Sequence, residues 1–241
     1  KIQRAGEAPS LYSELMGERT KIQLQNYLFN KGFFSASVKD SLIPARKNQV
    51  KILYKIDLGA LTTINNISIE SKDTIINNHL DVIKQKNLIK SGSPFDTDVL
   101  KLQRNNVTHY LQNNGFYTFN KEFVYYKIDT AKLENKVDVK LGIQNYKKIN
   151  NENKWYELQH QQYYLNQVEV KIKNSFINQP WECFDTLRSK SLKIYNCQPI
   201  SYHKRLLRNA ITFRKGELYK KNDAVDTYKK LISLYRAFQA V

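Results

Sequence analysis

The stretch HYLQNNGFYTFNKEFVYYKID, residues His109–Asp129, decides the fold because it joins a helix end, a glycine stop and a strand. Val107 and Leu111 lie at helical spacing just before the stop. Gly115 suits the left-handed conformation just past a helix, where any side chain would clash. The run after it is rich in aromatic and β-branched residues that alternate, as a strand prefers. The stretch therefore predicts a helix, a tight stop and a strand.

The same pattern occurs earlier in the chain, in NYLFNKGFFSASV at Asn26–Val38. Tyr27 and Gly32 precede Tyr110 and Gly115 by the same 83 positions. A second strand-like segment follows each of them, QVKILYKIDL in the first case and KVDVKLG in the second. A looser helix of this kind closes the chain. A fixed offset over helix, glycine, aromatic and strand is an internal repeat.

The repeat predicts three copies. We expect a first copy at residues 1–60 that lacks its leading strand, a second at 61–144, a polar connector at 145–162, and a third at 163–241 with an insertion at 174–198 and a truncated second strand. The incomplete ends suggest a piece of a longer chain. In the first copy we expect a helix at Leu11–Asn30 and strands at Phe34–Asp40 and Val50–Ile56. In the second copy we expect a strand at Thr63–Glu70, a helix at Thr74–Lys84, a helix from its cap Asp96 to Asn114, and two strands. In the third copy we expect a strand at Tyr164–Lys173, a short hairpin in the insertion, helices at Ser201–Ile211 and Asn222–Tyr235, and a strand from Phe238.

Composition raises a different class of function. The chain has 241 residues, 41% hydrophobic, and 39 Lys+Arg against 22 Asp+Glu give a net charge of +17. Such a charge is typical of modules that bind nucleic acid or anionic membranes. Here the lysines are spread along the chain, and no basic helix or zinc-finger spacing accompanies them. No apolar run approaches the roughly 20 residues of a membrane-spanning helix. We therefore expect no nucleic-acid partner and keep the basic binding module as the alternative.

The order strand, helix, helix, strand, strand resembles the POTRA (polypeptide-transport-associated) domain. The matching segments are Gly92–Asp96, Leu100–Arg104, Val107–Leu111, Asn114–Tyr117 and Asn135–Val139 in the second copy, Tyr27-Leu28, Lys31–Phe34 and Ala36 in the first, and Leu206–Arg208 and Gly216–Tyr219 in the third. The spacing looks most like the BamA/TamA-superfamily proteins of Bacteroidota of the kind called TamL.

This resemblance implies an α+β fold of tandem β-α-α-β-β units, each a small mixed sheet with two helices on one face, arranged as an extended arm. It implies the periplasmic portion of an outer-membrane protein, followed in the full-length protein by an outer-membrane β-barrel. The expected function is a non-enzymatic scaffold of an insertase or translocase. The expected partners are unfolded outer-membrane client proteins and accessory subunits, which are either periplasmic or lipoprotein subunits or a TamB-like protein.

An exposed strand edge offers a physical mechanism for client binding, because its unpaired N–H and C=O groups can accept an added strand. In POTRA-like folds the second strand is the usual edge. The candidate binding residues are Phe34, Ser35, Ala36 and Val38 in the first copy and Phe123, Val124, Tyr125, Tyr126, Lys127 and Ile128 in the second. The alternative is that Phe123 and Tyr125 are half-buried packing residues.

The remaining candidate residues suggest no chemistry. No nucleophile–base pair or phosphate-binding loop occurs, so we expect no catalytic residue, no cofactor and no metal. Cys183 and Cys197 in the insertion form a disulfide in an oxidising periplasm or remain two free thiols. Trp155, Tyr156, Tyr163 and Tyr164 around the connector either pack the junction between the second and third copies or form a partner-binding patch.

Overall fold

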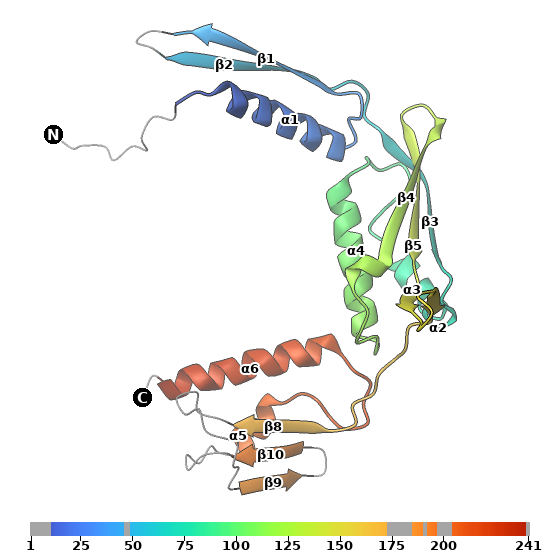
Figure 1. The fold of residues 1–241 in the computed structure, drawn as a ribbon, viewed down its shortest axis with the longest axis vertical. Helices are drawn as coiled ribbons and strands as arrows, with labels where there is room; N and C mark the ends of the chain where they lie inside the picture. The colour runs from blue at the N-terminus through green and yellow to red at the C-terminus, as the bar shows by residue number, and fades with distance from the viewer. Residues whose placement is uncertain (1–10, 46–48, 173–184, 190–191, 197–203, 240–241) are drawn as a thin grey trace, which may run out of the picture. The chain divides into compact units, whose positions relative to one another are not determined.

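A computed structural model describes residues 11–45, 49–172, 185–189, 192–196 and 204–239 (Figure 1). It has the mixed α+β class that the sequence predicts, with small sheets and separate helices. The chain divides into two compact units. The first comprises Lys1–Ile69, Lys86–Gln103 and Tyr126–Gly142, and the second comprises Glu70–Gln85, Arg104–Tyr125 and Ile143–Val241. Within the described ranges, no helix is long and apolar enough to cross a membrane.

The first copy consists of helix α1 and a two-stranded sheet. Helix α1 (Glu14–Asn30) begins at the N-cap Ser13, whose Oγ accepts the Met16 N–H at 3.3 Å. Strands β1 (Ser37–Pro44) and β2 (Val50–Asp57) pair antiparallel, and α1 lies along them (Figure 1). The predicted strand start at Phe34 is wrong. Residues 34 and 35 form a turn because the Ala36 N–H bonds back to the Phe33 carbonyl at 3.2 Å.

The second copy has the predicted order of elements. They are β3 (Thr63–Ser71), α2 (Thr74–Asn77), α3 (Leu80–Gln85), α4 (Thr97–Gln112), the 3-10 turn η1 (Lys121–Phe123), β4 (Val124–Leu133) and β5 (Lys136–Ile143). The helix expected at residues 74–84 is divided into α2 and α3, with Asn78 as the C-cap of α2. Asp96 is confirmed as the cap of α4, because its Oδ1 accepts the Asp98 N–H at 2.8 Å.

Strands β3, β5 and β4 form one sheet in that order, so β4 lies at an edge. The Thr63 N–H bonds to the Asn135 carbonyl, and the Ser71 hydroxyl bonds to the Ile143 carbonyl. Because the residue numbers on both strands increase from the first bond to the second, β3 and β5 run parallel. The core against this sheet consists of Ile64, Ile89, Phe95, Leu100, Val137 and Val139. Burial of such side chains is the main source of stability for a small sheet.

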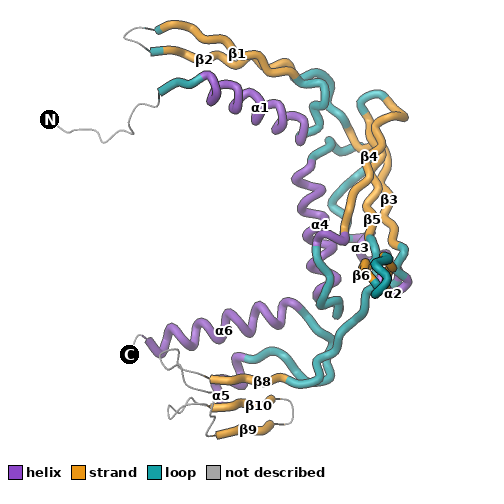
Figure 2. Tube along the Cα trace, in the orientation of Figure 1, coloured by secondary structure: helices purple, strands orange, loops and turns teal. Residues whose placement is uncertain are grey.

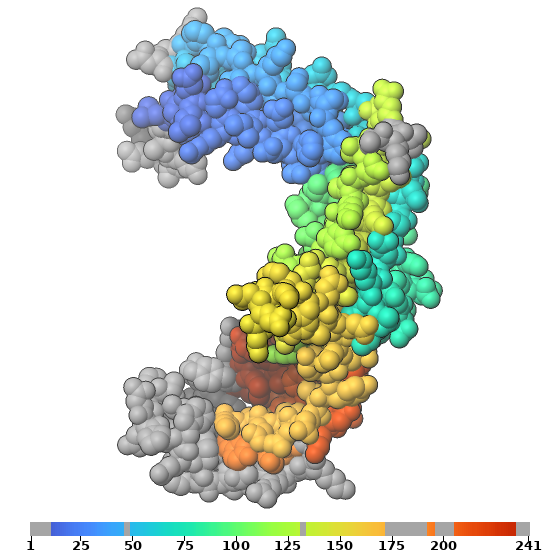
Figure 3. All heavy atoms as spheres, turned by 45° about the vertical axis from the view of Figure 1, so that its right-hand side comes forward, coloured from blue at the N-terminus to red at the C-terminus, as the bar shows by residue number. Residues whose placement is uncertain are grey.

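The stretch expected as a polar connector contains a hairpin of its own. Strands β6 (Tyr146–Ile149) and β7 (Trp155–Leu158) pair antiparallel, and all eight residues are exposed. The hairpin forms because Asn150 caps its tight turn, accepting the N–H groups of Glu152 and Lys154 on Oδ1. It is the yellow surface feature in Figure 3.

The third copy has β8 (Val168–Ile172), β9 (Asp185–Ser189), β10 (Leu192–Asn196), α5 (Lys204–Ala210) and α6 (Lys221–Gln239). The hairpin predicted in the insertion is present as β9 and β10. The sheet order is β8-β10-β9 (Figure 2). Strand β10 runs parallel to β8 and antiparallel to β9. This order matches β3-β5-β4, although here the hairpin precedes the helices in sequence.

The predicted strand start at Phe238 is wrong, because α6 continues through it to Gln239. No glycine stops the helix there, whereas Gly32 and Gly115 follow α1 and α4 at φ +90° and +92°. Cys183 and Cys197 lie outside the described residues.

Candidate functional site

The edge strand β4 carries most of the second set of predicted binding residues. Val124 is buried, and the Tyr126 hydroxyl donates to the Leu100 carbonyl at 2.8 Å while its ring packs on the core. Lys127 and Ile128 are exposed. This strand is ten residues long and lies at the edge of its sheet, and a long edge strand is a template for an added strand.

Phe123 does not belong to β4. It ends the 3-10 turn η1, and its ring lies 5.5 Å from the Phe119 ring, 4.6 Å from the His160 ring and 5.9 Å from the Tyr146 ring. These contacts make Phe123 a packing residue of the region that follows β5.

In the first copy, the predicted residues are divided between a turn and a strand. Ala36 and Val38 are buried, at 7% and 6% exposure. Phe34 packs against Phe29 and Phe95, with ring centroids 4.8 and 5.2 Å apart. The exposed apolar residues of this sheet are Leu42, Ile43, Val50, Leu53 and Ile56, none of which the sequence patterns had singled out.

One backbone hydrogen bond, from Thr62 N–H to Gly32 O, connects the first copy to the second, and three more within the second copy hold the segment around it. We call this arrangement the first joint. Its bonds run from Thr62 N–H to Gly32 O (2.9 Å), Phe95 N–H to Thr62 O (2.9 Å), Ile64 N–H to Ser93 O (2.9 Å) and Gly92 N–H to Ile64 O (2.7 Å). Gly32 is required here, because a Cβ would lie 2.7 Å from the Phe95 carbonyl oxygen and the residue has φ +90°.

The same four bonds recur in what we call the second joint, where one of them connects the second copy to the third and the other three lie within the third copy. They run from Tyr163 N–H to Gly115 O (2.9 Å), Tyr219 N–H to Tyr163 O (2.9 Å), Leu165 N–H to Glu217 O (2.9 Å) and Gly216 N–H to Leu165 O (2.6 Å). An edge-on aromatic pair also recurs, Phe34 with Phe95 at 5.2 Å and Tyr117 with Tyr219 at 4.9 Å. The repeat seen in the sequence therefore extends to a repeated joint.

Side chains around the two joints differ in chemistry. In the first joint, Lys31 Nζ bonds to Asp96 Oδ2 at 2.8 Å and to Asp98 Oδ2 at 3.0 Å. In the second joint, Lys221 Nζ bonds to the Gln112 amide oxygen at 2.7 Å, and the Asn222 N–H bonds to the Asn113 amide oxygen at 2.8 Å. The first joint is thus held by ion pairs and the second by amides.

The ion pairs of the first joint shift the ionisation of their members. Hydrogen bonds to Asp96 and then Asp98 raise the pKa of Lys31. Burial acts to raise the pKa of Asp96, but the hydrogen bonds from Lys31 and from the Asp98 N–H outweigh it and lower that pKa. Hydrogen bonds from Lys101 and then Lys31 lower the pKa of Asp98. All three groups are therefore charged over the neutral range.

A buried carboxylate fixes the chain just before the second joint. Asp73 is fully buried; its Oδ1 caps α2 by accepting the Ile75 and Ile76 N–H groups at 2.9 and 3.1 Å. Its Oδ2 accepts the backbone N–H of His160 at 2.5 Å. The sequence patterns missed this contact, since 87 positions separate the two residues.

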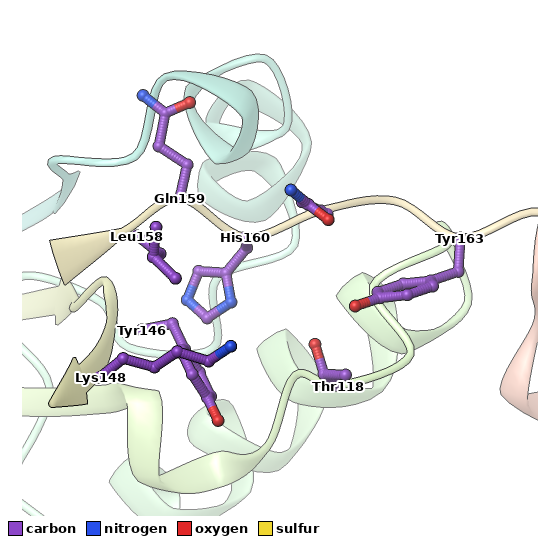
Figure 4. Close-up of a pocket in the computed structure, with 8 residues that line it drawn as sticks. Thr118, Tyr146, Lys148, Leu158, Gln159, His160 and Tyr163 are labelled. Atoms are coloured by element: carbon purple, nitrogen blue, oxygen red, sulfur yellow. The ribbon is translucent and has the colours of Figure 1, made fainter. Parts of the chain in front are cut away.

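Beside His160, a pocket of about 340 Å³ opens under the β6–β7 hairpin (Figure 4). It is lined by Thr118, Tyr146, Lys148, Leu158, Gln159, His160, Gln161 and Tyr163. His160 is 2% exposed, and its Nε2 lies 3.1 Å from the Gln144 carbonyl oxygen, to which it donates. Trp155 is 66% exposed and does not line this pocket. The ring of Tyr163 packs on the ring of Tyr117, with the two ring centroids 6.0 Å apart.

The described part of the chain contains no group of three or more His, Cys, Asp or Glu side chains that could hold a metal ion. What the described geometry offers is therefore a strand edge, two joints and a polar pocket.

No protein-family model matches the sequence, and no curated protein matches it. Solved structures do match. The chain is similar to POTRA3-5 of BamA from Haemophilus influenzae, at 11% identity and a TM-score of 0.48, over 94% of this chain and 72% of that one. It is similar to BamA from Haemophilus ducreyi lacking POTRA domains 1-3, at 20% identity and a TM-score of 0.39, over 59% of this chain and 25% of that one. It is also similar to POTRA1-2 of the periplasmic domain of Omp85 from Anabaena, at 10% identity and a TM-score of 0.39, over 75% and 82% of the two chains. At these values the likeness defines no family, and the function proposed below depends on the chain's own repeats, joints and strand edge.

Proposed function

We propose that this chain is a periplasmic POTRA arm of an outer-membrane β-barrel insertase or translocase. In this role it is a non-enzymatic scaffold that binds unfolded outer-membrane proteins, or accessory subunits, by strand addition. The three copies, the glycine stops at Gly32 and Gly115 and the strand–helix–helix–strand–strand order of the second copy support the POTRA assignment. The closer assignment to the TamL kind, with a TamB-like partner, depends on the sequence resemblance.

One observation carries the binding proposal. The strand β4 lies at the edge of the sheet β3-β5-β4 and exposes Lys127 and Ile128, while its Val124 and Tyr126 face the core. Backbone hydrogen bonds at such an edge bind extended segments with little dependence on their sequence. That tolerance suits a scaffold with many unfolded clients.

A photoreactive amino acid in place of Ile128 tests this proposal. Mixed with an unfolded outer-membrane protein and irradiated, this variant should form a covalent adduct. The matched control places the same group at Leu102, which is 53% exposed on helix α4. Equal capture at both positions, or no capture at Ile128, would contradict strand addition at β4.

The basic-module alternative has a test of its own, since the net charge of +17 favours anionic partners. Binding to DNA or anionic vesicles that weakens steeply with salt would favour that alternative. The proposed function predicts that the chain binds DNA and anionic vesicles only weakly, and that neither competes with the capture of an unfolded protein at Ile128.

The gene sequence downstream of Val241 tests the predicted barrel: alternating segments of about ten residues with aromatic girdles are expected.

A further inference from the structure

The pocket under the β6–β7 hairpin is chemically unlike the strand edge. Across the hairpin, Tyr146 pairs with Leu158 and Lys148 pairs with Tyr156, so these four residues share one face. Lys147 pairs with Glu157 on the opposite face. Figure 4 shows the ring of His160 and the side chains of Tyr146 and Lys148 directed toward the same space, with Gln159 pointing away.

The pocket carries positive charge and no negative charge. Lys148 is its cation, and none of its eight lining residues is acidic. The Lys148 ammonium lies 6.0 Å from the centre of the Tyr146 ring, and it makes no ion pair with any residue that the structure describes. An ammonium group beside hydroxyl groups that can donate hydrogen bonds is a favourable place for an anion.

Several features favour a carboxylate over a phosphate. One ammonium suits a monoanion, and the lining contains no arginine to grip a phosphate bidentately. Thr118, Tyr146 and Tyr163 contribute hydroxyl groups, while Leu158 and the two tyrosine rings supply apolar surface. A volume of about 340 Å³ is at the small end for ligand sites, enough for one aromatic or aliphatic group.

We propose that this pocket binds a carboxylate carried on an aromatic or aliphatic group, with Lys148 as the residue that pairs with the charge. The site is separate from the β4 edge and does not depend on the function proposed above.

The pocket is connected to the second joint through its own lining. Tyr163 lines the pocket, donates its N–H to the Gly115 carbonyl and accepts the Tyr219 N–H. The backbone N–H of His160 is fixed by Asp73. An occupant that packs against Tyr163 and His160 should therefore slow amide exchange at Tyr163 and Tyr219.

The test is an NMR titration of the ¹⁵N-labelled chain with 3-phenylpropionate, and with the neutral 3-phenylpropionamide as the matched ligand. The carboxylate should shift the amide signals of Thr118, Lys148 and Tyr163. Lys148→Gln should weaken its binding by roughly tenfold, as loss of one charged hydrogen bond implies. Lys147→Gln, one position away on the opposite face, should change the affinity by less than about twofold.

Three outcomes would overturn the proposal. Equal weakening by Lys147→Gln and Lys148→Gln would show only a general response to charge. Equal affinity for the neutral amide, or tighter binding of inorganic phosphate, would remove the carboxylate assignment. The absence of shifts at Thr118 and Tyr163 would place any binding elsewhere. Capture at Ile128 is a separate measurement, so failure here leaves the edge-strand result unchanged.

Discussion

The two joints have the same backbone bonds and different side-chain chemistry. In each, four N–H groups bond to the same relative positions, a left-handed glycine follows the helix, and an edge-on aromatic pair packs nearby. In the first joint, Lys31 bonds to two carboxylates, whereas Lys221 and Asn222 in the second bond to amide oxygens. The backbone pattern is thus the conserved part of the repeat within this chain, and the side chains around it vary.

The largest expected effect comes from the joint glycines. Gly32→Ala should lower the free energy of unfolding by about 3 kcal/mol, since a left-handed alanine is strained and its Cβ would meet a backbone oxygen. Gly115→Ala should cost less, about 2 kcal/mol, because the Cβ would lie 2.6 Å from Leu218 Cδ1, a side-chain atom that can move.

Gly92→Ala is the matched control for both. Gly92 has φ +80°, but nothing lies within 4 Å of an added Cβ, so only the backbone strain remains, about 1 kcal/mol. Urea denaturation of the three variants measures the series. Equal losses at Gly32 and Gly92 would contradict the close approach inferred for the first joint.

A smaller effect is expected from Asp73, which serves the second joint only. Asp73→Asn keeps an oxygen for the α2 cap but turns a donor toward the His160 N–H, so it should cost about 2 kcal/mol. Asp81→Asn removes an equal charge from an exposed position and should change stability by less than about 0.5 kcal/mol. Thermal unfolding of both variants compares them, and similar melting temperatures would argue against the buried contact.

The aromatic pairs should rank with their burial. Phe34→Ala should cost about 2 kcal/mol, because Phe34 contacts both Phe29 and Phe95, and Tyr117→Ala about 1 kcal/mol, because Tyr117 is 59% exposed. Tyr228→Ala, 66% exposed on α6, should be nearly neutral. The reverse ranking, measured by urea denaturation, would contradict the dependence of these costs on burial.

The smallest expected effect is a pH dependence of stability that only the ion pairs of the first joint should show. The lowered pKa values of Asp96 and Asp98 mean that their pairing stabilises the fold above the unfolded carboxylate pKa, about 3.9, and is lost as pH falls through the lowered folded values. The raised pKa of Lys31 keeps its contribution complete at neutral pH, and that contribution is lost only as pH rises through the raised folded value.

Lys31→Gln should therefore destabilise the chain slightly at pH about 7, and this effect should shrink as the pH falls through the lowered folded pKa values of the two carboxylates. Lys221→Gln is the control, because its amide partner does not titrate and its effect should stay the same as the pH falls. A pH-independent Lys31→Gln effect in urea denaturation would remove the ionic distinction between the joints.

Much of the fold could be predicted from local sequence. The 83-position offset located both glycine stops, and alternation located β4 and β5, because glycine and β-branched residues act through local backbone preferences. The errors also have local causes. Phe34 has strand propensity, but its packing on Phe29 and Phe95 holds it in a turn, and α6 continues past Phe238 because no glycine stops it.

The candidate site was less predictable. Tyr126 and Ile128 lie on the same face of β4, so the packing of Tyr126 and the exposure of Ile128 depend on how far the core extends along the strand, which a single strand does not encode. The contact of Asp73 with His160 joins residues far apart in sequence and uses a backbone donor, so neither residue's identity revealed it. The β6–β7 pocket depends on a hairpin whose polar sequence reads as a connector.

Hydrogen exchange with an unfolded outer-membrane protein present tests the central claim, strand addition at β4, most directly. The account predicts slower amide exchange within Val124–Leu133 on binding, with the exposed face of α4 unchanged. Protection confined to other parts of the chain, or no protection of β4 at a client concentration that gives a complex, would contradict it.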